Sequence, residues 1–435
     1  MAGQGGGFPL PSGAADTTFT NGFNAVLKDF FEGTVRDHLN TQVTLLQHIE
    51  KSKRSFVGRK IVFPVNLRRT SGVGARGENG TLPAADRQRY DDVNISAKYL
   101  YGRIELTGPV IEASRGDRGA FASALRSEVE GMRRDLRDDL NRQLFGLLPR
   151  KASDNSVMDL TGVLGVKSVA GTTTSKTQTL DSGNGKAGTR YLKPGMKVSI
   201  LASDGTHRGS TFIESVDSAN SQVVLDASTA VTQDDVFVRG DSSGSNSMNA
   251  ELTGIANIVQ AQSSGSFQAI STTDFPEWAA SELANSGTAR PLSLELMQLA
   301  VDTADEVGGA EPGLIMGHHS ARREYINLLT SDVRYAPEQL RGGFQKLSYA
   351  GGTNPIPIEF DKHCTYGALY FVNTADIKYY VQKDWAWANR DGSMMSRVVD
   401  KDAWEAFMCF YGELGCERRN THVLLKDLAI SNTIF

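Results

Sequence analysis

The stretch YLYGRIELTGPVIEASRGDRGAF, residues 99–121, connects two segments of opposite character. Around its start, VNISAKYLYGRIEL at 93–106 is rich in β-branched and aromatic side chains and predicts a strand. A long helix from about Asp117 to Phe145 follows, with one apolar face formed by Phe121, Leu125, Met132, Leu136, Leu140 and Leu144. A strand that leads into a long helix is therefore the first expectation.

Charged side chains cover the other face of this helix. Glu130 precedes Arg134, and Asp138 precedes Arg142, by four residues, which is the favourable order for ion pairs along a helix. Such a face is usually solvated, and ion pairs between subunits are the alternative.

A second strand, RKIVFPVNL at 59–67, precedes the first. Between the two strands, RRTSGVGARGENGTLPAADRQRYDD at 68–92 is polar and glycine-rich, which predicts an extended hairpin with a long tip. A two-stranded ribbon alone is marginally stable in water, and ordering each of its residues costs about 1–2 kcal/mol. Contacts outside the hairpin must therefore hold it, and another copy of the chain is the natural partner.

The tip of this hairpin is positively charged. Between residues 68 and 89, the two acids Glu78 and Asp86 are outnumbered by five arginines, Arg68, Arg69, Arg76, Arg87 and Arg89. We expect these arginines to contact an adjacent subunit through an acidic patch. The alternatives are nucleic acid and a merely solubilising loop.

The remaining chain divides into regions of different pattern. Residues 1–22 predict a flexible tail, and apolar steps of three and four between 23 and 49 predict an amphipathic helix packed on protein surface. Short strand-like runs between turn clusters at 161–253 predict an inserted all-β module, a small barrel or sandwich. Beyond residue 254 we expect an α+β layer, with helices at 292–307 and 320–329 and strands at 313–316, 356–360, 368–372, 377–381, 404–411 and 423–425.

The composition excludes several classes of protein. The 46 Lys and Arg against 50 Asp and Glu give a net charge of −4, too balanced for a tight grip on nucleic-acid backbones. Three cysteines are too few for a disulfide framework and suit a reducing compartment. No apolar run has the length of a membrane span, and the start MAGQGGGFPLPSG lacks the features of a secretory signal.

Motifs for catalysis or cofactor binding are weak. Gly72, Gly74 and Gly77 spell GxGxxG, but no helix start follows, so we expect no dinucleotide site. Residues 240–244 spell GxSxG around Ser242, in a flexible tract where a nucleophile elbow needs a strand, a turn and a helix. His363 and Cys364 have no CxxC or HExxH spacing of metal ligands around them. We therefore expect structural roles for the later histidines, His318, His319, His363 and His422. We therefore expect no catalytic, cofactor or metal site.

The order of these elements resembles that of one family, the major capsid proteins of tailed bacteriophages, which have the Hong Kong 97 fold. Besides residues 99–121, the similarity rests on RYLKPGMKVSI at 190–200, GALYFVNTADIKYYVQKDW at 367–385 and SRVVDKDAWEAFMCFYGELGCERRNTHVLLKDLA at 396–429. The resemblance implies an α+β fold with a flexible tail (1–22), an N-terminal arm (23–55), an extended loop lying over an adjacent subunit (56–107), a peripheral domain with the long spine helix (108–160, continued in 254–290 and 403–417), an inserted β-rich domain (161–253) and an axial domain (291–402, continued in 418–435).

Two features depart from the family pattern. The founding member joins subunits through an isopeptide bond between asparagine and a lysine of the extended loop. No lysine occurs here between Lys60 and Lys98, so we expect assembly without covalent crosslinks. The hairpin begins near residue 56, which leaves no room for a cleaved N-terminal scaffolding segment, so a separate scaffolding protein or none is implied.

By this resemblance the chain is a structural protein and not an enzyme. Pentamers and hexamers would assemble in the host bacterial cytoplasm into the icosahedral shell of a virion, which encloses double-stranded DNA without binding it sequence-specifically. A portal and decoration proteins would be further partners, and no membrane contact is expected. Two alternatives remain: a bacterial nanocompartment shell around protein cargo, and a cytosolic serine hydrolase that uses Ser242.

Overall fold

The computed structural model describes residues 43–68, 70–109, 118–147, 149–154, 158, 160–182, 186–240, 246–260, 265–332, 347–389 and 395–429. The expected tail, the expected helix up to residue 42, Arg69 and Ser242 lie outside these residues. Contacts divide the chain into two compact units, of which the first combines Met1–Asn40, Leu100–Arg137 and Lys383–Phe410. The second combines Thr41–Tyr99, Asp138–Gln382 and Tyr411–Phe435.

The strand and the helix on either side of the quoted stretch are both present. β4 (Lys98–Thr107) buries every second side chain, and α4 (Arg118–Phe145) follows it. Within the first unit, a Cβ on Gly102 of β4 would lie 2.7 Å from Leu136 Cδ1 and 3.0 Å from Met132 Sδ. The missing side chain therefore lets α4 lie close against the strand. The helix prediction is confirmed from Arg118 onward.

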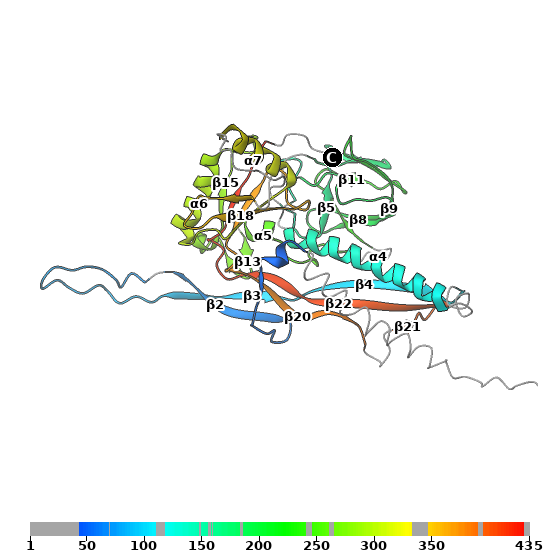
Figure 1. The fold of residues 1–435 in the computed structure, drawn as a ribbon, viewed down its shortest axis with the longest axis horizontal. Coiled ribbons are helices and arrows are strands. Elements are labelled where there is room, and N and C mark those ends of the chain that lie inside the picture. The colour runs from blue at the N-terminus through cyan, green and yellow to red at the C-terminus, as the bar shows by residue number, and fades with distance from the viewer. Residues whose placement is uncertain are drawn as a thin grey trace, which may run out of the picture. The chain divides into compact units, whose positions relative to one another are not determined.

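β4 belongs to a five-stranded sheet built around one long strand. β22 (Ala403–Cys416) pairs with β4, β20 (Ile377–Trp387) and β21 (Ser396–Arg397) (Figure 1). β1 (Glu50–Lys51) adds a short parallel pairing to residues 378–379 of β20. The predicted strands at 377–381 and 404–411 are confirmed and are longer than expected.

The predicted single strand at 93–106 is wrong, because the chain changes sheets inside it. β3 (Arg89–Ser96) pairs antiparallel with β2 (Lys60–Arg68) and forms the hairpin, whereas β4 joins β22. Between β3 and β4, the Ala97 N–H donates to the Arg59 carbonyl at 3.0 Å and closes the hairpin ladder.

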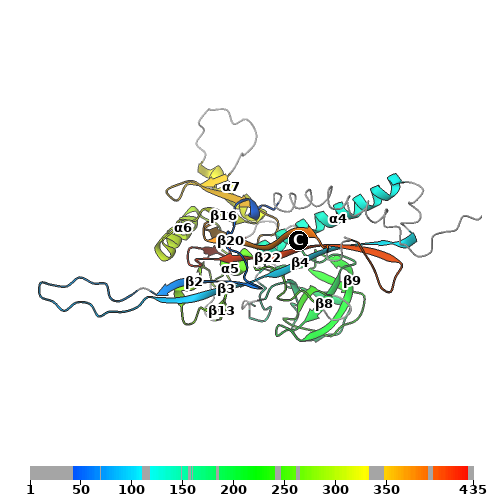
Figure 2. The same cartoon turned by 90° about the horizontal axis from the view of Figure 1, so that it is seen from below.

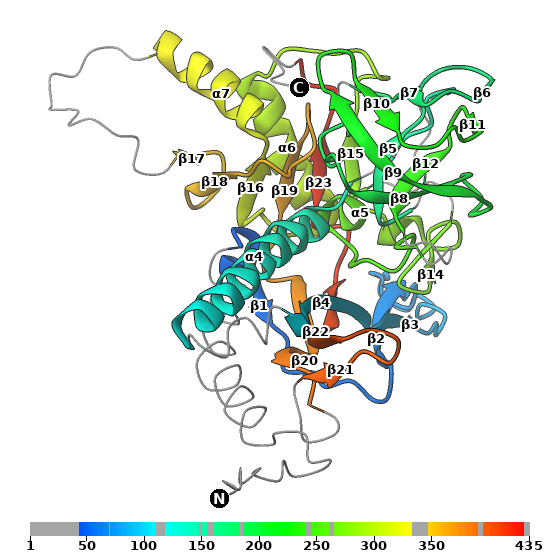
Figure 3. The same ribbon diagram turned by 90° about the vertical axis from the view of Figure 1, so that its right-hand side faces the viewer.

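The α+β part of the second unit is one mixed sheet with two helices. Its strand order is β15-β23-β19-β16-β18-β17, and α6 (Leu294–Gly308) and α7 (His319–Asp332) lie against it (Figure 3). Ser293 caps α6 by accepting a hydrogen bond from the Leu296 N–H at 3.2 Å. One apolar cluster contains side chains from both helices and the strands, which are β15 (Ser281–Leu283), β16 (Leu314–Gly317), β17 (Leu347–Tyr349), β18 (Ile356–Phe360), β19 (Leu369–Val372) and β23 (Val423–Leu425).

Residues 163–239 form a β module with a core of its own. A six-stranded sheet has the order β5-β12-β8-β9-β10-β7, and alternate residues of β12 enter two different apolar clusters. Phe237 belongs to one cluster, and Val236 and Val238 belong to the other. The sheet therefore buries side chains on both of its faces. Its strands, with a separate pair β6–β11, are β5 (Val163–Val166), β6 (Thr172–Thr173), β7 (Thr177–Thr179), β8 (Lys197–Leu201), β9 (His207–Asp217), β10 (Gln222–Leu225), β11 (Val231–Thr232) and β12 (Val236–Arg239).

The chain leaves for this module and returns from it at a single point, which we call the neck. Gly146 follows α4 at a φ of 68°, and a Cβ on Gly254 would lie only 2.4 Å from the Gly146 nitrogen. Side chains larger than hydrogen are excluded here because two backbone segments touch. Short elements follow the neck: α5 (Ile255–Ile258), β13 (Ser266–Phe267), β14 (Ile270–Ser271) and the 3-10 turn Pro276–Trp278.

Buried charges beside the neck replace one of the predicted ion pairs along α4. Arg142 does not pair with Asp138; it contacts Asp139 at 2.9 Å and Glu251 at 2.7 Å. Asp138 instead pairs with Lys362 and His363, and the hydrogen bond from His363 is the main cause that lowers its pKa. The prediction considered only pairs four residues apart on the helix, whereas Glu251, Lys362 and His363 come from other segments.

Candidate functional site

The extended hairpin is the candidate site, and its root is anchored in the second unit. Ile61, Phe63, Val93 and Ile95 are buried there. A Cβ on Gly415 would lie 2.3 Å from Ile95 Cδ1, so the hairpin contacts β22 closely. The Asn94 N–H donates to the Gln268 carbonyl at 2.9 Å, which ties β3 to the β13–β14 turn. The root therefore has both apolar and hydrogen-bonded anchors.

The outer part of the hairpin lacks an apolar core. Figure 2 shows the ribbon of this hairpin beyond β2 and β3. Among the described residues from Pro64 to Asp92, none is buried. Val73 and Leu82 in the tip have relative exposures of 70% and 82%. Apolar side chains this exposed on a narrow ribbon gain nothing from their own chain, and are the kind of surface that another protein covers.

Polar contacts close the tip. One Asp86 carboxylate oxygen accepts hydrogen bonds from the Ser71 N–H at 3.1 Å and the Ser71 hydroxyl at 2.7 Å. The Thr70 hydroxyl donates to the Asp86 carbonyl at 3.1 Å. The two bonds from Ser71, above all the one from its hydroxyl, lower the pKa of the Asp86 carboxyl group. The tip thus has a defined closure that depends on one exposed carboxylate.

The predicted site arginines fall into two groups. Arg76 donates to the Thr81 carbonyl at 2.9 Å, and the Arg89 guanidinium lies 4.5 Å from the centre of the Phe275 ring. Arg68 and Arg87 are exposed, and their side chains make no hydrogen bond or ion pair with any residue that the structure describes. Arg69 lies outside the described residues. Two of the five arginines are therefore engaged within the chain, and two are available to a partner.

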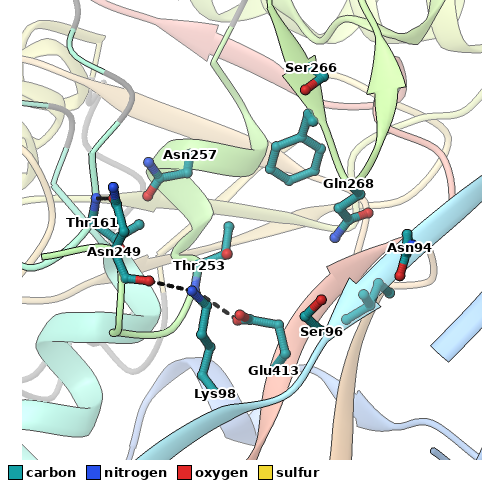
Figure 4. A pocket seen from close by; sticks show the side chains of 12 residues that line it. Asn94, Ser96, Lys98, Thr161, Asn249, Thr253, Asn257, Ser266, Gln268 and Glu413 are labelled. Carbon is teal, nitrogen blue, oxygen red and sulfur yellow. Dashed lines mark hydrogen bonds between the residues drawn. The ribbon is translucent and has the colours of Figure 1, made fainter. Parts of the chain in front are cut away.

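A polar cavity of about 310 Å³ lies beside the hairpin root (Figure 4). Glu413 is buried in its wall and accepts hydrogen bonds from the Thr253 N–H at 2.8 Å and the Leu414 N–H at 2.9 Å. Burial raises the pKa of Glu413 to about 7. Lys98 in the same wall donates to the Asn249 carbonyl. Sequence reasoning missed this cavity because its lining comes from five distant segments that share no motif.

The candidate catalytic residues do not come together in the part of the chain that is described. His422 is fully buried; its Nδ1 accepts from the Asn373 N–H at 3.1 Å, and burial lowers its pKa to about 4. His318 accepts from the Ser320 N–H at 3.1 Å at the start of α7, and His363 lies 3.3 Å from Asp138. His422, His318 and His363 thus each make a contact within the folded chain.

The other weak motifs also have structural explanations. Gly72, Gly74 and Gly77 lie in the hairpin tip, where the described residues include no helix that could hold a phosphate. Within the described ranges, no group of three or more His, Cys, Asp or Glu residues is arranged to hold a metal ion. None of the described helices combines the length and the apolar character that crossing a membrane requires.

Comparison with known proteins gives a likeness of fold. No family model and no curated protein matches the chain. Among solved structures, the capsid of cyanophage A-1(L) is similar, with 13% identity, a TM-score of 0.50, and coverage of 89% of this chain and 93% of that one. The capsid of the native GTA particle has 10% identity, a TM-score of 0.45, and coverage of 89% and 91%. The satellite phage P4 procapsid has 9% identity, a TM-score of 0.40, and coverage of 96% and 99%.

Proposed function

We propose that this chain, which has the capsid fold of tailed bacteriophages, is the shell subunit that encloses the double-stranded DNA of such a phage. Its work is mechanical: identical chains associate through different patches, and these contacts close into pentamers and hexamers. Many contacts of modest strength then act together because each one raises the local concentration for the next.

The observation that carries the proposal is the hairpin on this fold. Its root is buried in its own unit, whereas all described residues of its tip are at least partly exposed, including the apolar side chains of Val73 and Leu82. Arg68 and Arg87, together with Arg69, Arg76 and Arg89, would contact an adjacent subunit. Because no lysine occurs between Lys60 and Lys98, the loop has no amine for an isopeptide bond, so assembly is non-covalent.

Electron microscopy of the purified full chain tests this function directly. We expect closed shells of uniform diameter with five-fold and six-fold clusters, and a single band of monomer mass on a denaturing gel. A ladder of covalent oligomers would contradict the non-covalent assembly. A discrete small oligomer under all assembly conditions, with or without a co-expressed scaffolding protein, would contradict the shell itself.

The contents of the particles distinguish this function from a nanocompartment shell. Particles produced in the complete infection cycle should contain double-stranded DNA of genome length, measured by nuclease protection and gel electrophoresis. Particles that hold a specific enzyme and no DNA would contradict the phage assignment.

A further inference from the structure

Helix α6 has an outer face that no described residue of its own unit covers. Its inner face, with Met297, Ala300 and Val301, is buried in the apolar cluster of the sheet. On the outside, Leu299 and Val307 have relative exposures of 47% and 52%. Acids surround these two aliphatic side chains, and we call the whole surface the α6 face: Leu294, Glu295, Leu299, Asp302, Glu306 and Val307.

Two acidic residues lie at the less favourable end of α6. Asp305 and Glu306 lie in the last turn, where the carbonyl groups already carry partial negative charge, and that turn has no basic residue. Residues 294–308 contain no Lys or Arg at all. No ion pair from a described residue reaches Glu295, Asp302 or Glu306. A cation supplied from outside the chain would therefore stabilise this helix end.

The complementary surface lies where β1 turns into β2, in the segment KSKRSFVGRK at 51–60, which we call the basic turn. Val57, whose N–H donates to the Lys60 carbonyl across the turn, has a relative exposure of 85%. Lys53, Arg59 and Lys60 are exposed, and none of their side chains has a hydrogen bond or ion pair with a described residue. The basic turn thus combines exposed cations with an exposed aliphatic side chain, as the α6 face combines acids with Leu299 and Val307.

We infer that the basic turn of one copy docks on the α6 face of a second copy. Opposite charges steer the two surfaces together and fix their register, while Val57 is covered by the aliphatic side chains of the helix. Two different patches of identical chains meet, so the contact is heterologous and generates rings. The inference rests on the proposed shell function and names one of the contacts that close its rings.

Charge reversal tests the pairing. In one variant Asp302→Lys and Glu306→Lys are combined, and in another Lys53→Glu and Arg59→Glu. We expect each variant to lower the yield of rings and shells about tenfold or more, and the chain that carries both pairs to recover most of the yield. Glu214→Lys with Asp226→Lys, at exposed positions of the β module, is the matched control with unchanged assembly. Normal assembly of either variant, or no recovery in the combined chain, would overturn the pairing.

A disulfide experiment shows whether the contact joins two chains. One batch carries Glu306→Cys and the other Lys53→Cys; the natural cysteines Cys364, Cys409 and Cys416 are buried. Mild oxidation should link chains of the mixture into dimers and leave each batch alone as monomers. Absence of linked dimers in the mixture would overturn the docking. This readout needs only paired chains, so it remains informative if the wild-type chain forms no shells and the proposed function fails.

Discussion

The extended hairpin and the β module are both polar, glycine-rich segments, yet different contacts stabilise their folded structures. The module buries two apolar clusters on the two faces of its sheet. The hairpin buries Ile61, Phe63, Val93 and Ile95 at its root and nothing described beyond them. Composition alone therefore does not distinguish a self-sufficient insertion from a dependent one. What distinguishes them is whether alternate side chains have a second layer of the same chain to pack against.

Removing the hairpin tip should show most clearly that this segment depends on an adjacent subunit and not on its own chain. We expect replacement of residues 70–87 by Asn-Gly to abolish shell formation, because the surface for the adjacent subunit is gone. The free energy of unfolding of the isolated chain should change by less than about 1 kcal/mol, since the tip packs on nothing. Sedimentation velocity measures the first effect and urea unfolding the second. Glu78→Gln in the same tip is the control, and shells of normal yield from the shortened chain would contradict the dependence on a neighbour.

Within the β module, a substitution in the apolar core should lower the stability of the module itself. Phe237 is fully buried in its apolar cluster, and Phe237→Ala should lower the free energy of unfolding of the module by about 3–5 kcal/mol. Urea unfolding together with the rate of proteolysis between residues 163 and 239 measures the loss. Phe212→Ala removes an exposed ring on β9 and should cost less than about 1 kcal/mol. Equal costs at both positions would mean that the module lacks an independent core.

At the hairpin root, the buried carboxylate should make stability depend on pH. Glu413 has a pKa of about 7 in the folded chain against an ordinary 4.5, so the folded state binds more protons between these values. Stability should therefore fall as the pH rises from 4.5 to 7, by about 3 kcal/mol in total, and stay lower above pH 7. Glu413→Gln keeps an acceptor for the Thr253 and Leu414 N–H groups but cannot ionise, and should flatten this dependence in urea unfolding. The control Glu214→Gln, at an exposed position, should leave the pH dependence of the unfolding free energy unchanged. If this pH dependence persists in Glu413→Gln, another titrating group causes it.

The smallest expected effect is at the tip closure. Asp86→Asn weakens the two hydrogen bonds from Ser71, so hydrogen exchange of the amides at 70–86 should accelerate about threefold to tenfold without a change in global unfolding. Because the folded-state pKa of Asp86 is lowered, its contribution is complete above the ordinary value of 3.8 and disappears as the pH falls through the lower folded value. A shift in the global unfolding midpoint would show that the tip packs on the rest of the unit after all.

Sequence patterns predicted elements better than they predicted partners. The helix α6 with Ser293 at its start, and β18, β19 and β23, follow from local periodicity and capping, which depend on neighbouring residues only. The break at Ala97 was missed because β-branched residues continue on both sides, and only the pairing partner changes there. Asp138 and Arg142 were paired wrongly for the same reason, since their partners Lys362, His363 and Glu251 are distant in the chain.

The exposed hairpin tip was predicted in its position and only partly in its details, and the contact of its arginines with an adjacent subunit stays a prediction. Polarity, glycine content and the arginines of 68–92 indicated an exposed tip with no core. Sequence alone did not show that Arg76 and Arg89 are engaged within the chain, or that Asp86 closes the tip. The cavity beside Glu413 had no sequence signal, because residues of β3, β4, α5, the β13–β14 turn and β22 meet only after folding.

The contact between Gly146 and Gly254 brings the two ends of the intervening 107 residues together, so that these residues form an insertion with adjacent termini. A segment whose two ends touch can be shortened, exchanged or omitted without stretching the polypeptide on either side of the junction. Any foreign domain with adjacent termini should be accommodated there. An exchange that keeps Glu251 and Thr253 should therefore leave the buried contacts of Arg142 and Glu413 in place.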